Sequence, residues 1–131
     1  MNSIKVTVPV TVKAKFTEKL KARLIDEAVR VAEQMELELK QINIDMQREL
    51  DKNPEHEAQI RRFFGNEMAP RQGRLDEAHR RKETFEKLAL GAEVIQGNLE
   101  RQIDLKVGDN LRDAMNVELL VEDDKIIAIR G

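Results

Sequence analysis

The feature that most constrains this chain is an apolar stripe that repeats with helical spacing over residues 24–50. Its members follow one another at steps of three or four residues: Leu24, Ala28, Val31, Met35, Leu39, Ile42, Met46 and Leu50. From Ala28 onward the steps repeat every eleven residues, a period of about 3.67, which keeps the stripe almost straight along a helix. No Gly or Pro interrupts the run for more than 30 residues. We therefore expect one helix of about 50 Å, at about 1.5 Å per residue, with Thr17 as its N-cap.

A stop and a restart follow at Asn53-Pro54-Glu55. Asn caps helices well, Pro is favoured at the first helical position, and Glu suits the positive end of the helix dipole. A second helix with apolar residues at helical spacing extends from there to Leu90-Gly91, where Gly can adopt the left-handed closing conformation. A turn this short makes the two helices antiparallel neighbours, with the tip of the hairpin near residues 51–54.

A proline inside the second helix leaves an alternative open. Pro70 is flanked by Gly65 and Gly73, and a proline in a helix interior removes a hydrogen bond and clashes with the preceding turn. We therefore expect a kink or a break midway along this helix. The stretch from Gly65 to Gly73 is also an alternative position for the hairpin tip, although the Asn53-Pro54 signal is the stronger one.

Both chain ends alternate apolar and polar residues with a period of two, which is typical of β-strands with one buried face. Residues 4–12 and 99–107 show this pattern, and Pro9 predicts an edge position or a bulge because it cannot donate to a ladder. Asp109 or Asn110 is expected to cap a short helical turn. Residues 117–121 and 126–129 then face each other across four polar residues, which predicts a hairpin.

These patterns predict an α+β fold: a long, coiled-coil-like antiparallel helical hairpin over residues 17–91, and a small antiparallel β-module over residues 1–16 and 92–131. A two-stranded hairpin is marginal alone, and the helical hairpin returns the chain to the point where it left the first strand. The charges agree, because residues 1–17 carry three Lys and no acid, whereas residues 92–131 carry nine acids against five bases.

Composition excludes several classes of protein. Aromatic residues make up 3% of the chain and charged residues 37%, which favours long helices that bury a narrow stripe over a dense globule. The 25 acidic and 23 basic residues nearly balance, which argues against a protein that coats nucleic acid or anionic membrane. Without Cys there are no disulfides or thiol nucleophiles. No run approaches the roughly 20 apolar residues of a membrane span, so we expect no membrane association and a cytoplasmic location.

No motif indicates catalysis, a cofactor or a metal. The two histidines, His56 and His79, lie in different thirds of the second helix, and His79 is followed by three basic residues that repel cations. The carboxylates lie on solvated helix faces where nothing raises a pKa. We therefore predict a chain that is not an enzyme and that holds no cofactor and no metal.

Two surfaces are candidates for binding. Residues 58–82 carry seven bases against three acids, and Arg suits phosphate contacts, so Arg61, Arg62, Arg80 and Arg81 are candidate anion or RNA contacts. The alternative is that these bases form a solvent-exposed face whose positive charge balances the negative charge of the first helix. Leu37 and Ile44 lie opposite the apolar stripe, one above the other, at about 100° per residue. Together with Phe63 and Phe64 they form a candidate interface for a homo-oligomer.

The pattern of the two chain ends resembles the YlqD-like family of small bacterial proteins of unknown function. The motifs that carry the resemblance are residues 16–20, 91–97, 105–111 and 124–129, and it extends over essentially the whole chain. The resemblance implies no catalytic residues. In some members the gene lies near genes for ribosomal proteins and ribosome maturation, which implies a weak association with translation.

Two hypotheses for function follow. In the first, the chain is an interaction or scaffold module that presents its helical hairpin to an unidentified protein partner. In the second, it is an RNA- or ribosome-associated accessory factor that uses the Arg-rich half of the second helix. Salt separates the two, because phosphate-driven binding weakens steeply as salt rises whereas a contact between helix faces does not.

Overall fold

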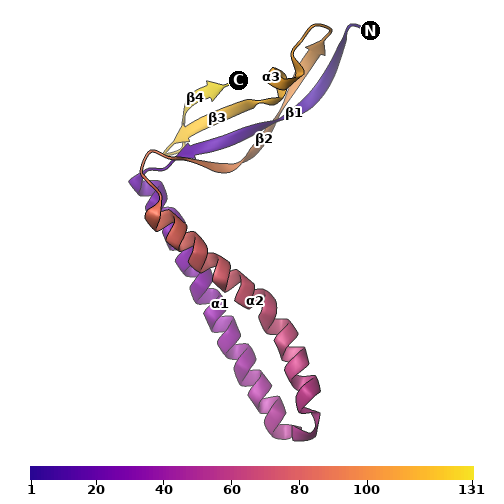
Figure 1. Ribbon diagram of the computed structural model, residues 1–131, viewed down its shortest axis with the longest axis vertical. Coiled ribbons are helices and arrows are strands. Elements are labelled where there is room, and N and C mark those ends of the chain that lie inside the picture. Colours follow the sequence, from indigo (N-terminus) through magenta and orange to yellow (C-terminus); the bar gives the residue numbers. More distant parts are fainter. The chain divides into compact units, whose positions relative to one another are not determined.

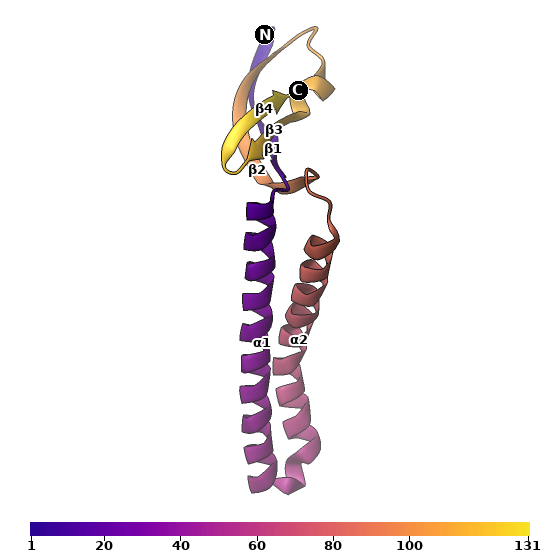
Figure 2. The same cartoon turned by 90° about the vertical axis from the view of Figure 1, so that its left-hand side faces the viewer.

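A computed structural model describes all residues, 1–131, and the chain has an α+β fold (Figures 1 and 2). It divides into two compact units. We call Met1–Leu20 with Leu88–Gly131 the sheet unit, and Lys21–Lys87 the hairpin unit. The sheet unit contains four strands contributed by both chain ends, and the hairpin unit contains most of two long helices.

The helical hairpin consists of α1 (Glu18–Lys52), one 3₁₀ turn (Pro54–His56) and α2 (Glu57–Lys87). Thr17 caps α1 as expected, since its Oγ1 accepts a hydrogen bond from the Leu20 N–H at 3.1 Å. The tip lies at Asn53, with Pro54 at the first helical position. The alternative tip between Gly65 and Gly73 is wrong, because both glycines lie inside α2.

Of the expected kink or break at Pro70, the break does not occur, because α2 continues through the proline. Tertiary contacts next to the proline explain this. The Arg71 side chain donates to Glu38 Oε1 on α1 at 3.2 Å and to the Glu67 carbonyl at 2.7 Å. Leu75 and Ala78 are buried directly afterwards. Packing and hydrogen bonds therefore hold the helix together on both sides of the missing N–H.

The core of the hairpin unit is a cluster of Ala32, Met35, Leu75 and Ala78, with Leu39 packed against it. Ala32 was absent from the predicted stripe, whereas Val31, which was part of it, is 37% exposed. On a helix with about 100° per residue, positions 31 and 32 lie on opposite sides of the line through Ala28 and Met35. The short Ala32 side chain faces α2, and Val31 lies at the edge of the contact.

The sheet has the strand order β2-β1-β3-β4. Its strands are β1 (Ser3–Lys15), β2 (Glu93–Lys106), β3 (Val117–Glu122) and β4 (Lys125–Arg130). The prediction of an antiparallel module is corrected: β1 pairs antiparallel with β2 but parallel with β3, so the sheet is mixed. The segment after β2, with the short helix α3 (Leu111–Met115), carries the chain past β1 to its other side. Asn110 caps α3 as expected, because its side chain accepts from the Asp113 N–H.

Pro9 was predicted at an edge or a bulge; it lies in the central strand, at a point where only β2 pairs with that strand. It is compatible with a central strand because β3 pairs with β1 only from Val10 to Ala14. Pro9 therefore precedes the parallel ladder by one residue, with β2 on its other side. The irregularity of β1 lies between Val12 and Lys13 and not at the proline.

The predicted C-terminal hairpin is confirmed, and it turns at two aspartates. Asp123 and Asp124 have φ values of +46° and +70°, the left-handed pair that suits a two-residue hairpin turn. The Asp123 carboxylate accepts a hydrogen bond of 2.7 Å from the Thr17 hydroxyl. Thr17 therefore holds the turn with its proton while its oxygen caps α1.

We expect Met35→Ala to destabilise the hairpin unit by about 2–5 kcal/mol, because it leaves a cavity at a side chain that is 2% exposed. Leu37→Ala is the matched control: Leu37 lies two residues away on α1, is 64% exposed, and should change stability by no more than about 0.5 kcal/mol. Urea unfolding followed by the helical circular dichroism signal measures both. Equal effects of the two substitutions would contradict the assignment of the core.

Candidate binding surfaces

The hairpin unit carries an open groove of about 500 Å³ between α1 and α2, which we call the interhelical groove. From α1 it is lined by Leu24, Glu27, Ala28 and Val31, and from α2 by Pro70, Gly73, Arg74, Glu77, Ala78 and Arg81. Its floor is apolar and its rims are charged. All of its residues belong to the hairpin unit.

The groove exists because small residues face each other across the two helices. Ala28 and Ala78 are buried but short, and Gly73 has no side chain. A Cβ added to Gly73 would find no heavy atom within 4 Å. The space beside these residues is therefore unfilled, and it leaves one side of Val31 open.

The two rims of the groove carry different charges. On the α2 rim, Arg74 makes no hydrogen bond or ion pair, and the Arg81 guanidinium lies 5.7 Å from the centroid of the Phe85 ring. Glu77 is neutralised by Arg80, with 2.8 Å between the charged atoms. On the α1 rim, the nearest cation to Glu27 is Arg23, at 3.9 Å. An acidic rim on α1 therefore faces a basic rim on α2.

A second open groove lies at the hairpin tip and has a volume of about 570 Å³. We call it the tip groove; it is lined by Glu49, Asn53, His56, Gln59, Ile60, Phe63 and Phe64. Glu49 is eighteen residues, or five helical turns, from Val31, and Phe63 is the same distance from Arg81. The two grooves therefore open on the same side of the hairpin, which we call the groove flank.

The four predicted interface residues do not form one surface. Leu37 and Ile44 are exposed on α1, opposite the buried stripe that faces α2. Phe63 is 60% exposed on the groove flank, and Phe64 is half-buried. The two rings are in edge-to-face contact, with 5.1 Å between their centroids.

Of the four predicted anion contacts, three interact with other side chains of α2 and one does not. Arg61 and Arg80 form ion pairs within α2, with Glu57 at 3.0 Å and Glu77 at 2.8 Å, and Arg81 lies over Phe85. Arg62 makes no hydrogen bond or ion pair. Sequence reasoning missed Arg74, which lines the interhelical groove without a partner. Its signals in the sequence are its place among the seven bases of residues 58–82 and the seven-residue spacing to Arg81.

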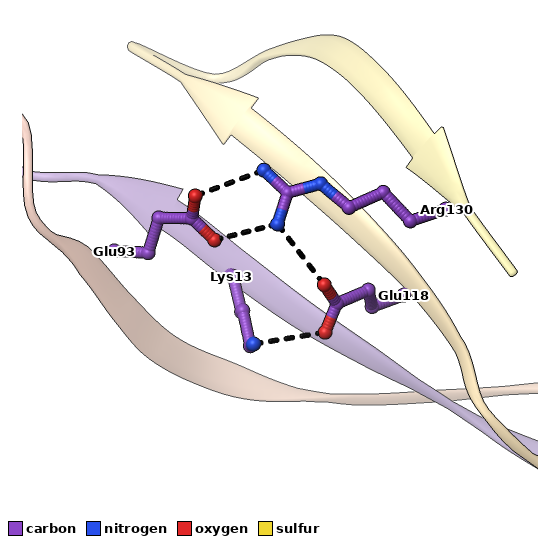
Figure 3. A network of polar contacts seen from close by, with 4 residues as sticks. All are labelled: Lys13, Glu93, Glu118 and Arg130. Atoms are coloured by element: carbon purple, nitrogen blue, oxygen red, sulfur yellow. Dashed lines mark hydrogen bonds and ion pairs between the residues drawn. The ribbon is translucent and has the colours of Figure 1, made fainter.

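A charged network joins all four strands of the sheet (Figure 3). Arg130 on β4 makes a two-pronged contact with Glu93 on β2, with both distances 2.8 Å, although β1 and β3 lie between these strands. Arg130 also donates to Glu118 on β3 at 3.1 Å. Glu118 in turn pairs with Lys13 on β1 at 2.9 Å. The complementary charges of the two chain ends therefore meet in this network.

The ion pairs of the network shift the pKa values of its carboxyl and guanidinium groups. The hydrogen bond from Arg130 lowers the pKa of the Glu93 carboxyl, and hydrogen bonds from Lys13 and Arg130 lower the pKa of Glu118. The same two carboxylates raise the pKa of Arg130. Every charged group in the network is therefore matched within the sheet, which identifies the network as structural.

Comparison with known proteins gives a family and a fold. A family model described as YlqD protein matches residues 4–130. A crystal structure of a protein of unknown function from Synechococcus sp. WH 8102 is similar, with a TM-score of 0.81 and 23% sequence identity, over 98% of this chain and 95% of that one. At this identity the likeness shows the fold alone. No curated protein shows significant similarity to the chain, and no helix is both long and apolar enough to cross a membrane.

Because the folded-state pKa values of Glu93 and Glu118 are lowered, the network stabilises the sheet at neutral pH, and this contribution is lost as the pH falls through about 4 and below. We expect Glu93→Gln to lower the melting temperature of the sheet at pH 7, and the difference from the wild type to shrink towards pH 3. Amide NMR signals of β1 and β2, followed during heating, measure it. Glu100→Gln, on the same strand but outside any ion pair, should show no such pH dependence; a similar response would contradict the role of the network.

Proposed function

We propose that this chain, which belongs to the YlqD family, is a non-enzymatic interaction module that binds a helix of a protein partner in the interhelical groove. The observation that carries the proposal is the combination of an apolar floor with oppositely charged rims between two helices. An amphipathic helix buries its apolar face in such a groove, and charged positions on either side of that face select the partner.

The spacing of the α2 rim supports recognition of a helix. Arg74 and Arg81 are seven residues apart, so they lie two turns from each other on one face, about 10.5 Å along α2 at about 1.5 Å per residue. Acidic side chains seven residues apart on a bound helix would match this distance.

The residues that line the groove support a binding role over a catalytic one. They include no Ser, Thr, Cys or His, which are the usual nucleophiles and proton carriers of active sites.

A second candidate function is association with RNA through the Arg-rich half of α2. The observation that favours it is that Arg62 and Arg74 have no acceptor within the chain. Against it, Arg61 and Arg80 are already paired with carboxylates of the same helix. Only Phe63 offers an exposed ring to stack a base.

Filling the groove tests the proposed function. Gly73→Leu places a side chain in the groove where nothing obstructs it, and removing a helical Gly should stabilise α2 by about 0.5–1 kcal/mol. Gly65→Leu is the matched control, because Gly65 also lies inside α2 with open space around it but outside both grooves. We expect Gly73→Leu to lose the proteins that the wild type and Gly65→Leu retain from a cell lysate.

The same experiment separates the two candidate functions. Nuclease treatment of the lysate should leave protein retention unchanged if a helix is bound, and should abolish it if RNA mediates the contact. Retention that is insensitive to Gly73→Leu would rule out the groove. Retention that falls steeply between low and moderate salt and disappears with nuclease would favour the RNA function.

A further inference from the structure

We propose that the surface that covers the interhelical groove is the same groove flank of a second copy of this chain. Two hairpins pack groove flank against groove flank about a two-fold axis parallel to their helices, and Glu27 of each copy pairs with Arg74 and Arg81 of the other. The inference rests on the proposed function, because it names the partner of the same groove.

Symmetry makes this arrangement self-consistent. In a two-fold contact the same patch is used by both copies, so each contact occurs twice with the partners exchanged. Rotation about an axis parallel to the helices leaves the height of every residue along the hairpin unchanged. It places α1 of one copy over α2 of the other, and neighbouring helices are antiparallel throughout. The product is a four-helix bundle, a common way for helical hairpins to cover their open faces.

The charges on the groove rims match under this operation. Glu27 lines the same groove as Arg74 and Arg81, so the three side chains lie at similar heights along the hairpin. The rotation brings the acidic α1 rim of each copy over the basic α2 rim of the other. Within one chain Arg74 has no partner, and Glu27 has only a 3.9 Å contact with Arg23. These charges are therefore available for contacts between copies, and each dimer would form two sets.

The apolar residues of the groove flank support the same contact. Val31 is 37% exposed beside the interhelical groove, and Phe63 is 60% exposed at the tip groove. Along α1, Val31 and the tip-groove residue Glu49 are eighteen residues apart, about 27 Å at about 1.5 Å per residue. A second hairpin would cover both grooves over this length. Leu37 and Ile44, on the opposite side of α1, would stay outside the contact.

A charge swap tests this interface in the full-length chain. Glu27→Arg places like charges opposite Arg74 and Arg81, and Arg74→Glu with Arg81→Glu places like charges opposite Glu27. We expect sedimentation equilibrium to show a wild-type dimer at tens of micromolar, and the dissociation constant of each variant alone to rise about tenfold or more. In an equimolar mixture of the two variants, both contacts become attractive again, so a heterodimer with affinity close to the wild type should form.

Matched controls reverse charge off the groove flank. Glu33→Arg lies on another face of α1, and Arg62→Glu lies on another face of α2 and removes no ion pair. Both should leave the dimer unchanged. Recovery in the mixture also excludes misfolding as the cause of weakening in either variant.

The possible outcomes separate this inference from the proposed function. A wild type that is monomeric at tens of micromolar overturns the dimer. So does a dimer that the charge reversals do not weaken, or variants that the mixture does not rescue. If Gly73→Leu still releases a retained protein in any of these cases, the groove keeps its role as a helix-binding site for a different partner. Both proposals are supported if Gly73→Leu dissociates the dimer and if, separately, the mixture of the two charge variants forms a heterodimer.

Discussion

The structure depends on the double pairing of β1, the central strand of the sheet. β1 pairs with β2 along its whole length and with β3 over Val10–Ala14. Where β1 ends, the Phe16 N–H donates to the Ala92 carbonyl at 2.7 Å, and the Gly91 N–H donates to the Phe16 carbonyl at 2.8 Å. Gly91 has a φ of +90°, a conformation that side chains disfavour. The chain therefore leaves and re-enters the sheet at adjacent points. The two helices between these points have 35 and 31 residues. Because they are antiparallel and nearly equal in length, the chain returns to the end of β1 where it left it.

The parts of the fold that follow local rules could be predicted from the sequence. Thr17, Asn110 and the Asp123-Asp124 turn each act through neighbours within a few residues, so their sequence signals suffice. The parallel pairing of β1 with β3 could not be predicted, because a period of two is the same in either direction. Pro70 predicted a kink or a break from local rules alone, whereas α2 continues through it beside the Arg71–Glu38 contact with α1. The interhelical groove was also missed, because it results from the absence of side-chain volume at Gly73 and beside Ala28 and Ala78.

The two units use charge differently. In the sheet unit, Lys13, Glu93, Glu118 and Arg130 satisfy one another across strands. In the hairpin unit most ion pairs join residues three or four apart on the same helix, and such exposed pairs contribute only about 0.3–0.5 kcal/mol each. Between the two helices, Arg71 pairs with Glu38 at 3.2 Å, and His79 lies 4.0 Å from Glu36. The charged contacts of the sheet unit therefore join different strands, whereas those of the hairpin unit are mostly local and its two helices pack through a narrow apolar stripe.

The central position of β1 has a consequence for biosynthesis. β1 leaves the ribosome before the helical hairpin, yet both of its neighbours in the sheet are C-terminal to the hairpin. At about 5–20 residues per second, β2 follows β1 after roughly 4–16 seconds, whereas helices form in about a microsecond. The helical hairpin can thus fold while the valine-rich strand before it is still unpaired. Lys5, Lys13 and Lys15 give that strand only positive charge, which hinders its association with the same strand of another nascent chain until the acidic C-terminal segment arrives.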